Sequence, residues 1–290
     1  MSHTPVLLQE ILTGLNLRAE QTIVDCTFGG GGHAAAIAGQ VHQVFAFDQD
    51  PHVPNYAADI LAANPNIKLI SSNFSQLAKY ITAPVDGFVF DLGVSSFQLD
   101  RAERGFSWRQ DCALDMRMDP RRPLTAEKIV NQYAEKELAD LIYNYGEEKY
   151  SRRIARNILA ARQKKPFTTS GQLKEIVWRS ISGSYTAKTA ALARVFQALR
   201  IAVNDELNIL AGALAGAADL LKTGGRLAVI SFHSLEDRIV KTVFKDLQKK
   251  GSFTILTKKP LRPSAVETQN NPRSRSAKLR LGEKGCMNKT

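Results

Sequence analysis

A run of glycines after the first predicted strand has the strongest chemical character in this sequence. Residues 22–26 (TIVDC) read as a buried strand, and Thr27-Phe28-Gly29-Gly30-Gly31-Gly32-His33 follows it. Glycines between a first strand and a first helix let a ligand approach the backbone closely. The run fits the pattern GxGxxA, which is weak evidence by itself, and a tight turn without a ligand is the alternative. Four consecutive glycines lose much chain entropy on folding, which favours a ligand-binding role.

Acidic residues end two further predicted strands. Residues 43–48 end in Asp48 and residues 86–91 end in Asp91. A carboxylate after the second strand can accept from both ribose hydroxyls of an adenosine, in nicotinamide and S-adenosylmethionine enzymes alike. Asp91 could accept from an ammonium group or a target amine, or could be an ordinary turn residue. Phe74, which follows the third strand, could flank an adenine or belong to the core.

The pattern of elements predicts one α/β domain with an insertion. Predicted strands at 22–26, 43–48, 67–71 and 86–91 alternate with helical segments, which is typical of a parallel sheet. Residues 105–205 show only helical spacing. A helix at 206–221, ended by Gly224-Gly225, a strand at 226–231, a helix capped by Ser234 and Asp237, and strands at 253–257 and 278–281 resume the pattern. We therefore expect a doubly wound domain of residues 1–104 and 206–290, interrupted by a helical domain of residues 105–205.

The charge is divided unevenly along the chain. The net charge is +11 overall, but residues 1–100 carry −6, residues 101–205 carry +8 and residues 241–290 carry +10. This asymmetry favours an acidic polymer such as nucleic acid, and a solubilising surface is the alternative. Candidate phosphate contacts lie in the insertion and in the tail, and include Arg152, Arg153, Arg156, Arg273, Arg275, Lys278 and Arg280.

Several protein classes are excluded by what the sequence lacks. The three cysteines share no short spacing, which argues against a zinc ribbon, a CxxC redox pair and a disulfide framework, and we expect no metal. No GK[ST] follows the glycine run, so a P-loop is not expected. No apolar run approaches about 18 residues and the first residues do not resemble a signal peptide, so we expect a cytoplasmic protein without a membrane span.

Successive blocks of the sequence resemble those of the RsmH (MraW) family. Besides the glycine run they are Asp91-Leu92-Gly93-Val94-Ser95-Ser96, Glu103-Arg104-Gly105-Phe106-Ser107, Leu114-Asp115-Met116-Arg117-Met118-Asp119, Tyr145-Gly146-Glu147-Glu148, Phe196-Gln197-Ala198-Leu199-Arg200-Ile201, Ser231-Phe232-His233-Ser234-Leu235-Glu236-Asp237-Arg238 and Asn271-Pro272-Arg273-Ser274-Arg275-Ser276. The resemblance runs from about His3 to Leu281. Because several blocks occur in order, it is far more specific than the glycine run alone.

The resemblance implies an S-adenosylmethionine-dependent methyltransferase acting on the N4 amine of a cytidine in the decoding region of 16S rRNA. It implies a Rossmann-like class I methyltransferase fold, with a seven-stranded, mostly parallel sheet and a helical insertion that binds RNA. The substrate would be the small ribosomal subunit or its precursor, and a homodimer is left open. The family's cofactor contacts fall on Gly31, Gly32, His33, Asp48, Phe74, Asp91 and Gln98. Gly30, where the family often has a basic residue, and Phe97, where it usually has proline, depart from the pattern.

Two other functions fit parts of the sequence. A nicotinamide-dependent oxidoreductase could share the fold, and a non-catalytic RNA-binding or ribosome-assembly protein could retain a vestigial site. Methylation at cytosine C5 would need a cysteine nucleophile, but no Pro-Cys pair occurs. Asp91-Leu92-Gly93-Val94 lacks the prolines and aromatic of many amino methyltransferases, so a catalytic role for Asp91 beside its cofactor role stays open. His233 could be a base or a turn residue.

Overall fold

Two compact units make up the chain in the computed structural model, which describes residues 5–286. Residues 1–94 and 207–290 form the first unit and residues 95–206 form the second. The chain passes from the first unit to the second between Val94 and Ser95, about ten residues before the expected boundary at 104/105. The reason is that the segment that begins at Ser95 packs with the helical unit. No helix of residues 5–286 is long and apolar enough to cross a membrane.

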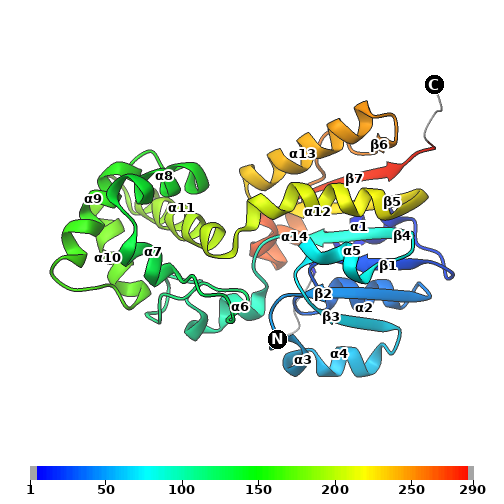
Figure 1. The fold of residues 1–290 in the computed structure, drawn as a ribbon, viewed down its shortest axis with the longest axis horizontal. Coiled ribbons are helices and arrows are strands. Elements are labelled where there is room, and N and C mark those ends of the chain that lie inside the picture. Colours follow the sequence, from blue (N-terminus) through cyan, green and yellow to red (C-terminus); the bar gives the residue numbers. More distant parts are fainter. Residues whose placement is uncertain (1–4, 287–290) are drawn as a thin grey trace. The chain divides into compact units, whose positions relative to one another are not determined.

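A seven-stranded sheet forms the centre of the first unit. Its strands are β1 (Thr22–Asp25), β2 (Gln43–Asp48), β3 (Ile67–Ser71), β4 (Val85–Asp91), β5 (Leu221–Ser231), β6 (Phe253–Ile255) and β7 (Lys278–Lys284). The order across the sheet is β3-β2-β1-β4-β5-β7-β6, and only β7 runs antiparallel to its neighbours (Figure 1). The predicted Rossmann-like α/β sheet, seven-stranded and mostly parallel, is confirmed. The strand order reverses between β1 and β4, which is where such sheets bind ligands.

Helices cover both faces of this sheet (Figure 1). One face packs against α5 (Leu77–Tyr80), α12 (Glu206–Leu220) and α13 (Ser234–Lys249), the other against α1 (Leu8–Leu15), α2 (Gly32–Ala38) and α3 (Val53–Tyr56). Along β4, Phe88 and Phe90 belong to the first core and Val89 to the second. Burial on both faces explains why these strands read as continuous apolar runs. The other elements of this unit are α4 (Ala58–Ala63), η1 (Phe74–Gln76), α14 (Ala265–Asn270) and η3 (Pro272–Ser276).

The start of β5 differs from the prediction. We expected a helix to 221 and a strand from 226, with Gly224-Gly225 as the helix end. The strand instead begins at Leu221 and contains both glycines. Leu221 pairs with Val85 and Arg226 with Gly87, so β5 carries extra residues in a bulge. Gly224, at φ 79°, provides the left-handed backbone that such an irregularity needs.

The second unit is helical, as its spacing predicted. It contains α6 (Ser96–Asp100), η2 (Ala102–Arg104), α7 (Ala126–Gln132), α8 (Glu135–Gly146), α9 (Ser151–Arg162), α10 (Ser170–Ser180) and α11 (Tyr185–Asn204). The predicted capping box of Thr169 and Gln172 opens α10. An isolated antiparallel bridge joins Ala113 to Thr169.

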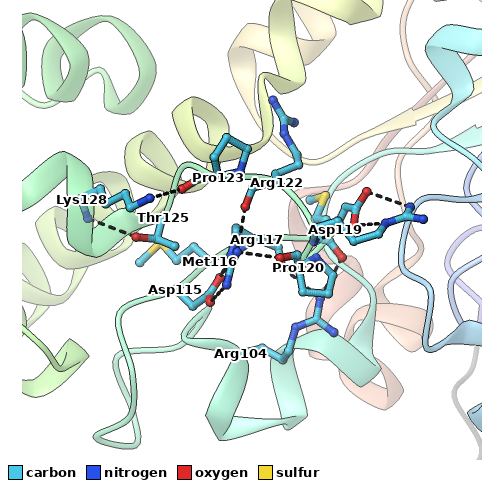
Figure 2. Close-up of polar contacts among 12 residues, drawn as sticks. Arg104, Asp115, Met116, Arg117, Asp119, Pro120, Arg122, Pro123, Thr125 and Lys128 are labelled. Atoms are coloured by element: carbon cyan, nitrogen blue, oxygen red, sulfur yellow. Dashed lines mark hydrogen bonds and ion pairs between the residues drawn. The ribbon is translucent and has the colours of Figure 1, made fainter.

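A long loop before α7 is held by its own charged side chains (Figure 2). Arg117 donates to both carboxylate oxygens of Asp115, at 2.8 and 2.6 Å, and to two carbonyls further along the loop. Arg104 donates to two more loop carbonyls, and Asn204 of α11 accepts from the Met118 amide at 2.7 Å. This block of the sequence therefore builds a rigid loop, because its charges satisfy backbone groups that no helix or strand pairs.

Candidate functional site

Three carboxylates gather at the carboxyl edge of the sheet in the first unit. Asp25 ends β1, Asp48 ends β2 and Asp91 ends β4, and these three strands are neighbours. Because parallel strands end at one edge, the acids surround the point where the strand order reverses. Asp25 was not among the expected site residues, although its place before the glycine run was a usable signal.

The glycine run forms a loop that Asp48 anchors. Asp48 accepts from the Gly29 amide at 2.8 Å through one oxygen and from the Asp50 amide at 2.8 Å through the other. Gly31 has φ 76°, and a Cβ there would lie 2.7 Å from Phe28 Cζ. A Cβ on Gly32 would lie 2.6 Å from Pro5 Cγ. The glycines therefore satisfy both backbone conformation and close packing.

His33, in the first turn of α2, is buried between the N-terminal segment and Asp91. Its Nε2 lies 2.9 Å from the Val6 carbonyl and its Nδ1 lies 3.6 Å from Asp91 Oδ2. A carbonyl only accepts, so the proton of the neutral ring sits on Nε2. Burial lowers the pKa of His33, which keeps the ring neutral near pH 7. His33 therefore lies beside Asp91, and its anchor on Val6 left no sequence signal; its cofactor role stays a prediction.

Asp25 and Asp91 are buried acids with spare oxygens. Oδ2 of Asp25 and Oδ1 of Asp91 have no hydrogen-bond partner within residues 5–286. Burial, with a smaller contribution from the charge of Glu236, raises the pKa of Asp91 to about 7. Burial likewise raises the pKa of Asp25 to about 6, although a hydrogen bond from the Thr27 amide opposes the shift. Buried carboxylates of this kind are stabilised by a cationic ligand, and an ammonium or sulfonium group fits them.

The start of α13 brings Glu236 and His233 to the same edge. We expected Ser234 and Asp237 to cap this helix, but the capping box consists of His233 and Glu236, one residue earlier. Glu236 Oε2 accepts from the amides of Phe232 and His233, at 2.8 and 3.3 Å. Asp237 instead pairs with Arg280 at 2.7 Å and with Lys278 at 3.3 Å. Glu236 is thus a buried charge that sequence reasoning missed.

Phe74 and Gln98 have different surroundings. Phe74 begins η1, packs partly buried against the core, and meets Phe90 edge-on with ring centroids 5.5 Å apart. Gln98 belongs to the helical unit, where it forms a capping box with Ser95. Its Oε1 accepts from the Ser95 amide at 3.2 Å. The cofactor roles of both residues therefore stay predictions.

The predicted phosphate contacts differ in how exposed their side chains are. Arg152 and Arg153 are exposed on α9, and Arg156 lies 3.8 Å from Glu135. Arg273 and Arg275 are exposed on η3. Lys278 and Arg280 are not suited to the role that we expected, because Asp237 pairs with both and Arg280 is buried.

Comparison with known proteins identifies the family. The sequence model of the MraW methylase family matches residues 1–285. The chain belongs to the MraW methylase family. The chain is 46% identical to the ribosomal RNA small subunit methyltransferase H of Carboxydothermus hydrogenoformans, covering 98% of both chains. It is 46% and 43% identical to proteins of the same name from Acidobacterium capsulatum and Brevibacillus brevis, over 97% of this chain and 98% of each relative.

Membership in the MraW methylase family confirms the resemblance and the enzyme class. The protein is a methyltransferase with S-adenosylmethionine as methyl donor. A nicotinamide-dependent oxidoreductase and a non-catalytic binding protein are both excluded. Within residues 5–286 no group of three or more histidine, cysteine and acidic side chains could hold a metal ion.

Proposed function

We propose that this methyltransferase modifies the N4 amine of a cytidine in the decoding region of 16S rRNA. The observation that carries the proposal is the buried, unpartnered oxygen of Asp91 beside the glycine loop, in a chain of the MraW methylase family. The names of the three relatives support small-subunit ribosomal RNA as the substrate. We infer that the protein works in the cytoplasm on the small subunit or its precursor; a homodimer stays a prediction.

The cofactor would lie along the edge formed by β1, β2 and β4. Asp48 would accept from the ribose hydroxyls, and the backbone of Gly31 and Gly32 would line the loop side. Asp91 and Asp25 offer free carboxylate oxygens to the cationic end of the molecule. When bound, S-adenosylmethionine supplies an activated methyl group on a sulfonium. Holding donor and amine in line can itself contribute about 7–11 kcal/mol in ideal cases.

The residues of the site favour transfer to an exocyclic amine without a covalent enzyme–RNA intermediate. Attack at C5 would need a cysteine thiolate, and Cys26 at the end of β1 is buried in the core. Burial and the charge of Asp25 raise the pKa of the Cys26 thiol, which leaves it unreactive. Asp91, if it also faces the amine, can accept one of its hydrogens as the nitrogen becomes tetrahedral.

The helical unit offers a surface for the RNA backbone. Arg152 and Arg153 are exposed in the first turn of α9. Beside them lies an open pocket of about 410 Å³ whose lining includes Lys149 and Tyr150, and also Arg194, which is already paired with the buried Glu148. Cationic side chains next to an aromatic ring are suited to phosphates and an unpaired base. We propose that Arg152, Arg153, Lys149 and Tyr150, with Arg273 and Arg275 of the first unit, contact ribosomal RNA.

The test is to locate the methyl group on its target. Purified protein, S-adenosylmethionine and unmethylated small subunits are incubated, and the nucleosides are mapped by mass spectrometry. We expect N4-methylcytidine in 16S rRNA. Finding 5-methylcytidine, or trapping the enzyme on a 5-fluorocytidine substrate, would overturn the proposed chemistry.

A further inference from the structure

His233 is a buried imidazole at the edge that holds Asp91. It follows β5 directly, and β5 pairs with β4 so that Ile230 lies opposite Asp91. The neighbouring Phe232 packs along the turn after Asp91, because a Cβ on Gly93 would lie 3.7 Å from Phe232 Cδ2. The side chain of His233 is 9% exposed. It therefore stands at the sheet edge where the reaction takes place.

The hydrogen bonds around His233 fix which nitrogen carries the proton. Nδ1 accepts from the Glu236 amide at 3.4 Å, as the capping group of α13. An imidazole nitrogen that accepts has no hydrogen, so the neutral ring carries its proton on Nε2. His233 therefore presents a donor to its surroundings, and it is not free to accept a proton at Nε2.

This donor makes no hydrogen bond within residues 5–286, and the nearby Glu236 carboxylate is only an ion-pair neighbour. Nε2 lies 3.2 Å from Glu236 Oε1 but makes no hydrogen bond to it or to any other residue of the described chain. The other oxygen of Glu236 accepts from two backbone amides, which holds the carboxylate in place. A buried donor without an acceptor is costly and rare, and one at a functional edge indicates that a ligand supplies the acceptor.

We propose that His233 Nε2–H donates to ring nitrogen N3 of the target cytosine and so orients the base for methylation. This inference rests on the proposed function. The acceptor must be neutral, because Glu236 and Asp91 would repel a carboxylate or a phosphate. N3 is the acceptor next to the N4 amine, so one residue can hold the ring while the amine meets the methyl group. Uracil carries a hydrogen on N3, so its N3–H and the His233 Nε2–H would face each other as two donors. His233 would therefore favour cytosine over uracil.

Two substitutions separate the donor from the cap. In His233→Asn the amide oxygen takes the place of Nδ1 as the helix cap, while its nitrogen falls short of Nε2. In His233→Gln the amide nitrogen reaches the position of Nε2, while the cap is weakened. Steady-state methylation of small subunits, S-adenosylmethionine affinity by calorimetry, and thermal stability are measured for both variants and the wild type.

We expect His233→Asn to keep its stability and its S-adenosylmethionine affinity but to lose about tenfold in kcat/KM for the subunit, the effect of one hydrogen bond. His233→Gln should be less stable yet recover most of that activity. Full activity of His233→Asn would show that His233 is only a helix cap and would overturn the inference. So would an equal loss in both folded variants, or a fall in cofactor affinity. A wild-type protein that leaves the subunits unmodified would instead refute the proposed function.

Discussion

At the sheet edge, a buried carboxylate that lowers the stability of the empty protein is suited to binding a cationic ligand. Asp91 is buried with a free oxygen, and its pKa is raised to about 7 mainly by burial. Ionisation of this group therefore costs the empty protein free energy, and a cation recovers it. His33, which lies beside Asp91 and is bonded to the Val6 carbonyl, stays neutral because burial lowers its pKa.

Cofactor affinity should depend on pH through Asp91. Only the ionised form of Asp91 attracts the cationic end of the cofactor. Below about pH 7 Asp91 must therefore lose its proton before the cofactor binds. We expect affinity to fall by up to about tenfold per pH unit just below this value, and more steeply below about pH 6, where Asp25 also takes up a proton; proton release should accompany binding. Calorimetry between about pH 5.5 and 8.5, in two buffers of different ionisation enthalpy, measures both quantities. A flat profile without proton release would contradict the raised pKa.

Asp91→Asn should stabilise the empty protein while it weakens cofactor binding. The pKa rises from 3.8 in the unfolded chain to about 7 in the fold, so ionisation destabilises the fold progressively across this interval and fully above it. The shift is about 3 pKa units, so at about 1.4 kcal/mol per unit the gain at pH 8 is of the order of 4 kcal/mol. Urea unfolding at pH 8 and at pH 4 provides the measurement. The variant's advantage should shrink towards pH 4, and a constant difference would point to another cause.

At the scale of elements, the sequence predicts the buried strands but misses element ends that depend on contacts between distant segments. The strands are correct to within a few residues at most ends, because buried parallel strands are continuous apolar runs. The start of β5 and the cap of α13 are wrong, since a bulge opposite β4 and the choice of His233 over Ser234 depend on packing. Of the site, the loop and the strand-end acids were predictable. The bond from His33 to Val6 was not predictable, because it joins two segments that are distant in the sequence. The role of Glu236 was not predictable either, because it caps its helix together with a histidine, which is an unusual capping residue.

The glycine loop should tolerate no side chain at Gly31. Gly31→Ala places a Cβ at φ 76°, 2.7 Å from Phe28 Cζ. We expect a loss of about 1–3 kcal/mol in stability and a marked loss of cofactor affinity. Gly212→Ala on α12 is the matched control, since nothing lies within 4 Å of its Cβ position. It should leave affinity unchanged and stabilise the helix by up to about 1 kcal/mol. Equal behaviour of the two variants would show that the loop adapts.

At the scale of the whole molecule, charge separates cofactor binding from RNA binding. The carboxylates of the sheet edge lie in the acidic first third of the chain, and the exposed arginines lie elsewhere. Neutralising Arg152 with Arg153, or Arg273 with Arg275, should raise KM for the subunit and leave cofactor affinity alone. Each lost phosphate contact should lower the log–log salt slope by about 0.7–0.9. Lys136→Gln, on a side chain already paired with Asp140, is the control. Variants with wild-type slopes would mark these arginines as a solvated surface.

The position of β7 between β5 and β6 determines when the sheet can be completed during synthesis. β6 ends at Ile255 and its partner β7 begins only at Lys278, near the end of the chain. The helical unit, in contrast, is one continuous stretch from Ser95 to Glu206. A nascent chain can therefore fold its helical unit while β4, which pairs with β1 on one side, still lacks its other partner β5, encoded after that unit. A premature stop before residue 278 would leave an open edge on β5, and such a product is a natural target for proteolysis and aggregation.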